Sequence, residues 1–323
     1  MIGVQTRSIA ATIAVAAMLG ACQDIRPPRT GASSSPASAP SDSTVPATSQ
    51  QAVATAEPGE FAPPGHDQIP EGPYGDIVRK GRDIFTNTGV HAAAYVGNSL
   101  SCGNCHLDAG RLANSAPLWG AYVRYPAYRS KTGQVNNYTE RLQGCFVYSM
   151  NGKAPPAGSP ELVALETYSY WMAQGAPVGA QLPGAGYPKD FKPPQPPDYA
   201  RGEVVFQQSC ALCHGADGQG QRVADLQVFP PLWGPESYNW GAGMHQLDNA
   251  AGFIKANMPL GRGGSLSDQQ AWDVALFMNA HERPQDPRFT GNLAQTRQQF
   301  HDDPNSLYGR EVDGRLLGAN PSR

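Results

Sequence analysis

Two short stretches decide the fold: Cys102-Gly103-Asn104-Cys105-His106 and Cys210-Ala211-Leu212-Cys213-His214. Each has the Cys-x-x-Cys-His pattern of c-type haem attachment. Two thiols at this spacing can bond to the vinyl groups on one porphyrin edge, and the next residue brings an imidazole to the iron. Zinc would need a second pair of ligands near each stretch, and the sequence has none there. It therefore predicts two covalent haem c groups, with these attachment thiols and iron ligands: Cys102, Cys105, His106, Cys210, Cys213 and His214.

The sequence around the two stretches repeats. Residues 77–85 and 199–206, which precede them, have apolar side chains at helical spacing and one glycine suited to close packing. After each stretch comes the same tetrapeptide, Pro117-Leu118-Trp119-Gly120 and Pro231-Leu232-Trp233-Gly234. A repeat of this length indicates a duplicated structural unit.

Each half of the repeat ends in an apolar segment that is predicted to be a helix. The first covers residues 160–173, with Ser159 as its N-cap and a proline at its first position. The second covers residues 268–280, where Ser267 and Gln270 can form a capping box. The expected fold class is all-α, with two tandem cytochrome c domains that each wrap around one covalent haem.

Composition divides the rest of the 323-residue chain, which contains 30 prolines and 36 glycines. Residues 26–70 are rich in Pro, Ser, Ala and Thr and have too few large apolar side chains to form a core. A segment with six prolines joins the two halves. The expected parts are a signal peptide (1–21), a tether (22–70), domain 1 (71–181), a linker (182–197), domain 2 (198–285) and an unassigned tail (286–323).

The N-terminus has the features of an export signal. Arg7 precedes an apolar run, which ends in Leu19-Gly20-Ala21-Cys22, a lipobox. Cys22 is therefore expected to carry the lipid of a periplasmic, membrane-anchored protein. Cleavage near Ala21 without lipidation is the alternative. Gln23, which follows the cysteine, favours the outer membrane.

The second axial ligand of such a domain comes from the loop before its last helix. In the second half this loop holds Met258, followed by a proline that stiffens it. Met244 and His245 are rivals, but they come earlier and lack that proline. The corresponding place in the first half holds Cys145, with Met150 as its rival.

The surroundings of Cys145 are basic. Residues 111–153 contain one acid, Glu140, although the whole chain has a net charge of −3. Such a run favours a thiolate and attracts dianions. Two alternatives remain open: a small buried thiol, and a solvated basic face that docks a partner cytochrome. The basic residues of the run are Arg111, Arg124, Arg129, Lys131, Arg141 and Lys153.

Residues 136–151 read NNYTERLQGCFVYSMN. This stretch resembles the active-site segment of dihaem thiosulfate dehydrogenases, also called tetrathionate synthases. The similarity extends to SCGNCHLDAGR at 101–111 and YWMA at 170–173, and it covers residues 71–285.

The resemblance implies a role for each haem. Haem 1, with His106 and Cys145 as axial ligands, would carry the chemistry, and haem 2, with His214 and Met258, would relay electrons. Some members of the family have a lysine before the methionine as an alternative ligand. This chain has Asn257 there, so an exchange of ligands is not expected. The catalytic residues implied by the resemblance are Cys145, Arg141 and either Arg129 or Lys131.

The implied reaction joins two thiosulfate ions into tetrathionate and releases two electrons to a soluble acceptor such as a c-type cytochrome. Basic side chains suit it because two dianions must meet. A dihaem electron carrier without catalytic activity and a haem-dependent sulfane sulfur transferase are the competing functions. Nothing in the sequence favours nucleic-acid binding, and the only expected membrane contact is the lipid.

Overall fold

The computed structural model describes residues 61–224 and 226–322. The predicted signal peptide, Cys22 and most of the tether lie outside these residues. Within the described part of the chain, no helix is both long and apolar enough to cross a membrane. All of the described residues belong to one compact unit, 52–323.

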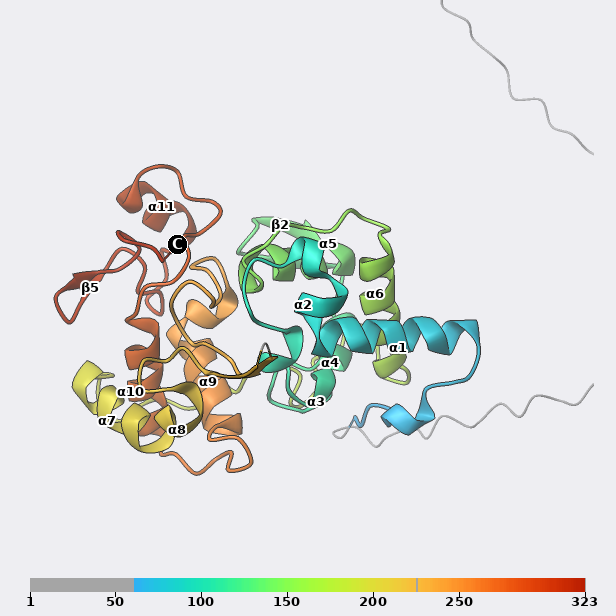
Figure 1. Ribbon diagram of the computed structural model, residues 1–323, viewed down its shortest axis with the longest axis horizontal. Helices are drawn as coiled ribbons and strands as arrows, with labels where there is room; N and C mark the ends of the chain where they lie inside the picture. Colours follow the sequence, from blue (N-terminus) through green and yellow to red (C-terminus); the bar gives the residue numbers. More distant parts are fainter. Residues whose placement is uncertain (1–60, 225, 323) are drawn as a thin grey trace, which may run out of the picture. The chain divides into compact units, whose positions relative to one another are not determined.

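The first half is mostly helical (Figure 1). Short helical turns, η1 (His66–Gln68), η2 (Ala93–Tyr95) and η3 (Cys102–Asn104), accompany its helices. One antiparallel hairpin joins β1 (Ala127–Arg129) to β2 (Gln134–Asn136), and Ala127 lies opposite Asn136. The remaining elements are α1 (Pro73–Thr86), α2 (Thr88–His91), α3 (Leu107–Gly110), α4 (Leu118–Tyr122), α5 (Tyr138–Gly144), the π-helical η4 (Cys145–Ser149) and α6 (Pro160–Met172).

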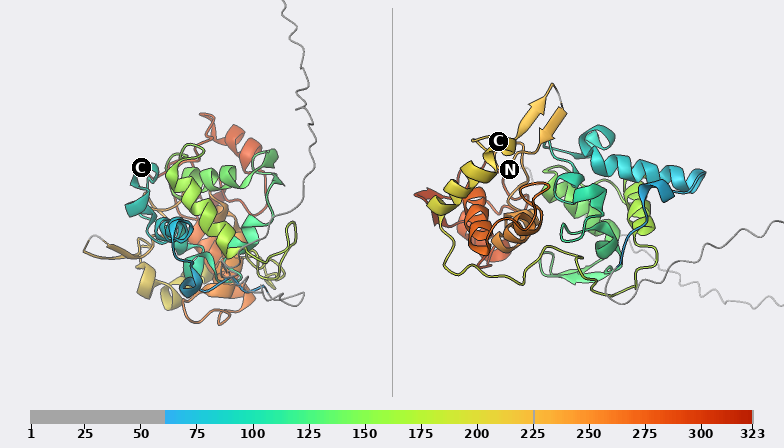
Figure 2. Two further views of the ribbon diagram at one scale, coloured as in Figure 1. Left: turned by 90° about the vertical axis from the view of Figure 1, so that its right-hand side faces the viewer. Right: turned by 90° about the horizontal axis from the view of Figure 1, so that it is seen from below.

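The second half repeats this plan. Its hairpin, β3 (Gln221–Val223) with β4 (Leu226–Phe229), projects away from the helices (Figure 2). Its helices are α7 (Tyr199–Ser209), α8 (Ala211–His214), η5 (Gly243–His245), α9 (Leu247–Asn257) and α10 (Asp268–Asn279). The tail adds α11 (Leu293–Phe300) and the strands β5 (Glu311–Val312) and β6 (Arg315–Leu316).

The closing helices begin where the caps predict. The Ser159 side chain accepts a hydrogen bond from the Leu162 backbone amide at the start of α6. Ser267 and Gln270 form the capping box of α10. These bonds satisfy amides that the first helical turn leaves without partners, so both helix starts were readable from the sequence.

Each half packs its first helix against its last, α1 on α6 and α7 on α10. A glycine lies at each crossing. A Cβ atom on Gly81 would lie 2.1 Å from the Ala164 carbonyl oxygen, and one on Gly202 would lie 2.1 Å from that of Asp273. Only glycine permits so close an approach, which confirms the packing role predicted for these residues.

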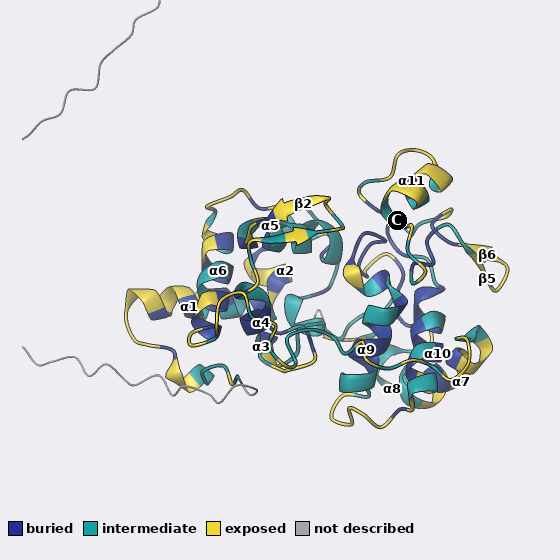
Figure 3. Cartoon of the chain, turned by 180° about the vertical axis from the view of Figure 1, so that it is seen from behind, coloured by how far each residue is buried: buried dark blue, intermediate teal, exposed yellow. Residues whose placement is uncertain are grey.

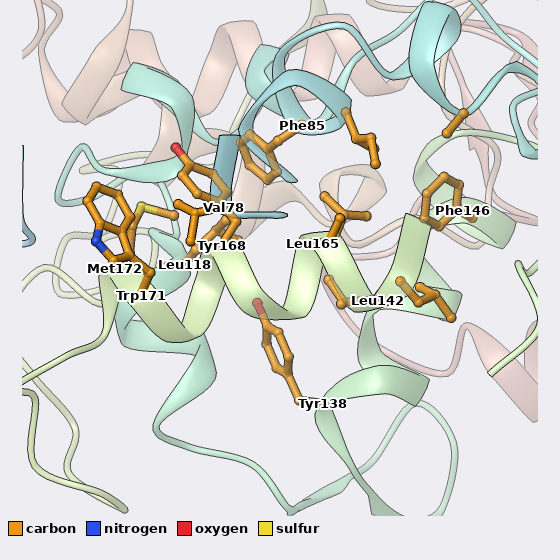
Figure 4. Close-up of a cluster of buried hydrophobic side chains, with 14 of the residues drawn as sticks. Val78, Phe85, Leu118, Tyr138, Leu142, Phe146, Leu165, Tyr168, Trp171 and Met172 are labelled. Carbon is orange, nitrogen blue, oxygen red and sulfur yellow. The ribbon is translucent and has the colours of Figure 1, made fainter. Parts of the chain in front are cut away.

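Each half has its own apolar core, although Tyr238 and Ala242 of the second half are buried in the first core. Side chains from α1, α4, α5, η4 and α6 gather in the first core (Figure 4). The second core draws on residues 205–278. Trp119 and Trp233, from the repeated tetrapeptide, are buried one in each core. The sequence repeat therefore corresponds to a repeated packing unit.

Two features depart from the expected plan, and a third concerns the tail, which the sequence left unassigned. The last residues of the predicted tether are packed, because Ile69 is buried and the Phe61 ring lies 5.3 Å from that of Trp119. Three short hairpins accompany the helices of the expected all-α fold. The tail is also packed: Leu307, Tyr308 and Leu317 are buried in a third core, while the outer face of α11 is exposed (Figure 3).

Candidate functional site

The first Cys-x-x-Cys-His stretch lines a pocket with about 810 Å³ of unfilled space, its mouth included. Cys102, Cys105, His106 and Cys145 all lie on its wall. His106 donates from Nδ1 to the Ala116 carbonyl oxygen at 2.7 Å. Since this bond fixes the ring and the tautomer, Nε2 is left available for a metal.

The second stretch lines another pocket, with about 1320 Å³ of unfilled space including its mouth. Cys210, Cys213, His214 and Met258 lie on its wall. His214 donates from Nδ1 to the Pro230 carbonyl oxygen at 3.0 Å, which again leaves Nε2 available. Each pocket thus has two thiols, one oriented imidazole and a further sulfur donor, and this donor set fits a covalent haem.

The rival ligands differ in position. Met150 lines the first pocket together with Cys145, and Met244 lines both pockets. His245 is on neither wall, because its Nδ1 bonds to the Ala242 carbonyl oxygen and its Nε2 lies 3.2 Å from Ser306 Oγ. The geometry therefore removes His245 as a rival of Met258.

Cys145 lies where the regular helix α5 gives way to the wider π-helical turn η4. Asn137 caps α5 and forms a capping box with Glu140. The four-residue spacing then places Arg141 on the same helix face as Cys145. Arg141 donates from Nη1 to Cys145 Sγ at 2.8 Å, and the charge of the Cys145 thiolate raises the pKa of the guanidinium.

Arg129 and Lys131 follow from the β1–β2 hairpin. Burial and the charge of Arg141 lower the pKa of Arg129, whereas Cys145 opposes this shift. Lys131 donates from Nζ to the Gly241 carbonyl oxygen, and burial together with neighbouring arginines lowers its pKa to about 7. The structure thus places Arg141 on Cys145 and Arg129 within its electrostatic influence, while Lys131 lies near both arginines.

In the described part of the chain, no carboxylate forms an ion pair with Arg129, Lys131 or Arg141. Positive charge in a half-buried site without an acidic partner is unfavourable unless an anion is bound there. The arrangement is therefore suited to binding an anion beside the Cys145 sulfur.

The tail brings a residue that the sequence analysis did not select. Arg288 donates to the Lys131 carbonyl oxygen at 3.3 Å, and its guanidinium lies 5.2 Å from the Tyr148 ring centre. The Lys131 ammonium lies 3.9 Å from the same ring centre. Both cations therefore contact the π-face of Tyr148, an interaction that stabilises them. Only the folded chain brings residues 131, 148 and 288 together, so no local pattern pointed to Arg288.

Arg288 is held by a buried acid. Its Nη2 donates to Asp286 Oδ2 at 2.7 Å, and His301 Nε2 donates to the same oxygen at 2.9 Å. Burial alone would raise the pKa of Asp286, but these hydrogen bonds outweigh burial and keep it well below its ordinary value. The tail thus fixes the far side of the cationic site.

Helices that enclose two pockets, each with a Cys-x-x-Cys-His stretch and an additional sulfur donor, define a c-type cytochrome. The domain families that match agree. "SoxA/TsdA, cytochrome c domain" matches residues 89–178. "Cytochrome C oxidase, cbb3-type, subunit III" matches residues 197–278. The protein therefore carries covalently bound haem c.

Whole-chain comparisons give the family. A thiosulfate dehydrogenase of Thiomonas intermedia (strain K12) is 59% identical over 259 residues, which are 80% of this chain and 82% of the relative. A thiosulfate dehydrogenase of Stutzerimonas stutzeri (strain A1501) is 55% identical over 260 residues, which are 80% of this chain and 85% of the relative. The chain belongs to the thiosulfate dehydrogenase family, a family of oxidoreductases.

A solved structure is also similar. It is the "as isolated" form of the thiosulfate dehydrogenase TsdBA from Marichromatium purpuratum, with a TM-score of 0.78 and 49% identity. The similarity covers 81% of this chain and 58% of that longer one.

Proposed function

We propose that this protein oxidises two thiosulfate ions to one tetrathionate ion and passes two electrons to a soluble acceptor such as a c-type cytochrome. It does so as two tandem cytochrome c domains, each with one covalent haem. His106 and Cys145 hold the iron of haem 1, and His214 and Met258 hold that of haem 2. The two haems supply one-electron acceptors for the two-electron reaction.

The contact between Arg141 Nη1 and Cys145 Sγ at 2.8 Å carries this proposal. It places a fixed cation beside a nucleophilic sulfur in the wall of the first haem pocket. An electron carrier that uses Cys145 only as an iron ligand has no need of further cations. Here Arg129 and Lys131 add two, and neither has an acidic partner among the described residues.

The cations lower the electrostatic barrier of the reaction. Two thiosulfate dianions repel each other as their sulfane sulfurs approach, and guanidinium groups offset this repulsion by charge-assisted hydrogen bonds. Arg141 is bonded to Cys145, and the charge of Cys145 also acts on Arg129. The sequence left open whether Arg129 or Lys131 contacts thiosulfate. Arg129 is the better candidate to hold thiosulfate at Cys145 Sγ, and Lys131 adds a further positive charge that attracts anions.

Cys145 acts as the nucleophile. A sulfur–sulfur bond forms between its thiolate and the sulfane sulfur of the first thiosulfate, two electrons leave, and Cys145–S–S–SO3⁻ results. The sulfane sulfur of the second thiosulfate then attacks the adduct at the sulfur atom that is bonded to Cys145 Sγ. The bond to Cys145 breaks, tetrathionate departs, and the cysteine is again a thiolate.

The chain's export signal gives the proposed location. Cys22 anchors the protein by lipid in the periplasm, preferably to the outer membrane. Such an anchor needs no membrane-spanning helix.

Tetrathionate formation by purified, haem-loaded protein tests the proposal, with thiosulfate as substrate and ferricyanide as acceptor. The pyridine haemochrome assay should give two haems per chain. Cys145→Gly should keep both haems and the fold, because the thioethers and His106 remain, but it should form no tetrathionate. Met150→Leu should keep the spectrum of a thiolate-ligated haem. One haem per chain, or full activity of Cys145→Gly, would refute the proposal.

A further inference from the structure

The two haem pockets share a wall. Leu100, Cys105, Tyr238 and Met244 line both of them. Asn98 ties the two halves together beside this wall, since its Nδ2 donates to the Ser149 carbonyl oxygen at 2.9 Å and to that of Ser237 at 3.1 Å. The two pockets therefore adjoin each other across these shared side chains.

Arg283 lies directly behind this wall and is fully buried. Its guanidinium carbon is 4.2 Å from the ring centre of Tyr238 and 5.2 Å from that of Trp240. Stacking on two aromatic faces holds the cation in place. Arg283 therefore puts a formal positive charge next to a side chain that both pockets share.

The chain does not neutralise this charge. Nη1 donates to the Leu232 carbonyl oxygen at 3.4 Å, and Nη2 donates to the Asn279 side-chain oxygen at 3.2 Å. Both acceptors are uncharged. Among the described residues no carboxylate pairs with Arg283, and its Nε has no hydrogen-bond partner. A buried arginine in this condition costs stability, so its position calls for a functional reason.

We propose that Arg283 is a positioning residue for electron transfer, a buried cation that raises the reduction potential of the haem held by Cys210, Cys213 and His214. This inference rests on the proposed two-haem function. A haem that takes up one electron gains negative charge, and a cation nearby in a medium of low dielectric stabilises that state. Transfer oxidises the first haem and reduces the second, and Arg283 favours this direction.

The hydrogen bonds of Arg283 indicate why its charge should raise the reduction potential of the second haem more than that of the first. Leu232 and Met278, whose carbonyl oxygens both accept from Arg283, line the second pocket and not the first. Tyr238, by contrast, is shared. The potential of the first haem is therefore expected to shift in the same direction but by less.

Spectroelectrochemical titration of the purified dihaem protein tests the inference through potentials rather than activity. Arg283→Met removes the charge. Asn279→Asp keeps the arginine and nearly the same shape but places a carboxylate on it, so the test survives if Arg283→Met fails to fold. Each should reduce the equilibrium constant for reduction of the second haem at least tenfold, which is 59 mV for one electron.

Two further variants separate charge from structure. Arg283→Lys keeps the cation and should hold the second haem's potential closer to the wild-type value than Arg283→Met does. Lys192→Gln removes one exposed positive charge from the linker, where water screens it, and should leave both potentials unchanged.

The outcomes distinguish this inference from the proposed function. Unchanged potentials in Asn279→Asp, or equal shifts in Arg283→Lys and Arg283→Met, would overturn the role of Arg283 while leaving thiosulfate oxidation intact. A wild-type protein with one haem, or with no thiosulfate oxidation, would instead refute the proposed function.

Discussion

Replacing Arg141 by glutamine removes the cation that touches the reactive sulfur and leaves a shorter, neutral polar side chain. Arg141 Nη1 lies 2.8 Å from Cys145 Sγ, and no carboxylate of the described chain shares the guanidinium. We expect Arg141→Gln to keep both haems and the fold. Its effect should fall on the steps in which two anions meet.

The size of the effect follows from two estimates. Loss of one preorganised donor to a developing charge costs about 3 to 4 kcal/mol, which is roughly 10² to 10³ in kcat. A unit charge about 4 Å from another contributes about 4 kcal/mol at an effective dielectric constant of about 20. Because the two estimates agree, we expect kcat/KM for thiosulfate to fall about 10² to 10³-fold in Arg141→Gln.

Steady-state oxidation of thiosulfate with ferricyanide, at equal haem content, measures this loss. Arg141→Lys keeps the positive charge but loses the planar guanidinium with its several donors. Its activity should therefore lie between those of wild type and Arg141→Gln. Arg124→Gln removes an exposed arginine of the same basic run and should behave as wild type. If Arg141→Gln retained kcat/KM within about threefold of wild type, or if Arg124→Gln lost as much, the assigned role of Arg141 would be wrong.

Three further results are expected. Since the pKa of Lys131 is lowered to about 7, its charged form is lost as the pH rises through that value, so kcat/KM should fall above about pH 7; Lys131→Arg should flatten the pH profile there. In chemical denaturation, Gly81→Ala should lower the free energy of unfolding by about 1 to 3 kcal/mol, because its Cβ meets the α6 backbone. Gly89→Ala is the control and should not destabilise the fold, because nothing lies within 4 Å of a Cβ at that position. Cys22→Ser should move the protein from the membrane fraction to the soluble periplasm; unchanged partition on cell fractionation would contradict the anchor.

The sequence predicted those parts of the molecule that local patterns encode. Capping chemistry at Ser159 and Ser267 set the starts of two helices, because caps depend on residues three positions apart. The resemblance of residues 136–151 to the family's active-site segment pointed to Arg141 and Cys145, and the structure shows that the two lie on one helix face. Met258 and the two Cys-x-x-Cys-His stretches could also be selected from the sequence, because each belongs to a short local pattern.

Contacts between distant segments were not predictable in this way. Arg288 reaches Lys131 across 157 positions of sequence, and Arg283 reaches Leu232 across 51. The tail carries no motif, yet the buried pair of Asp286 and His301 fixes it beside the cationic site. Such residues gain their roles only when the chain is packed, so the structure was needed to find them.

Cys145→Met tests the central claim most directly, because it separates iron ligation from nucleophilicity. A thioether can fill the sixth position of haem 1 and raise its potential, but it cannot form the sulfur–sulfur bond to thiosulfate. Tetrathionate formation by this variant should be measured alongside its haem content and potential. We predict two haems, a higher haem 1 potential and no tetrathionate. Tetrathionate formation at near the wild-type rate would contradict the covalent mechanism and leave Cys145 as an iron ligand alone.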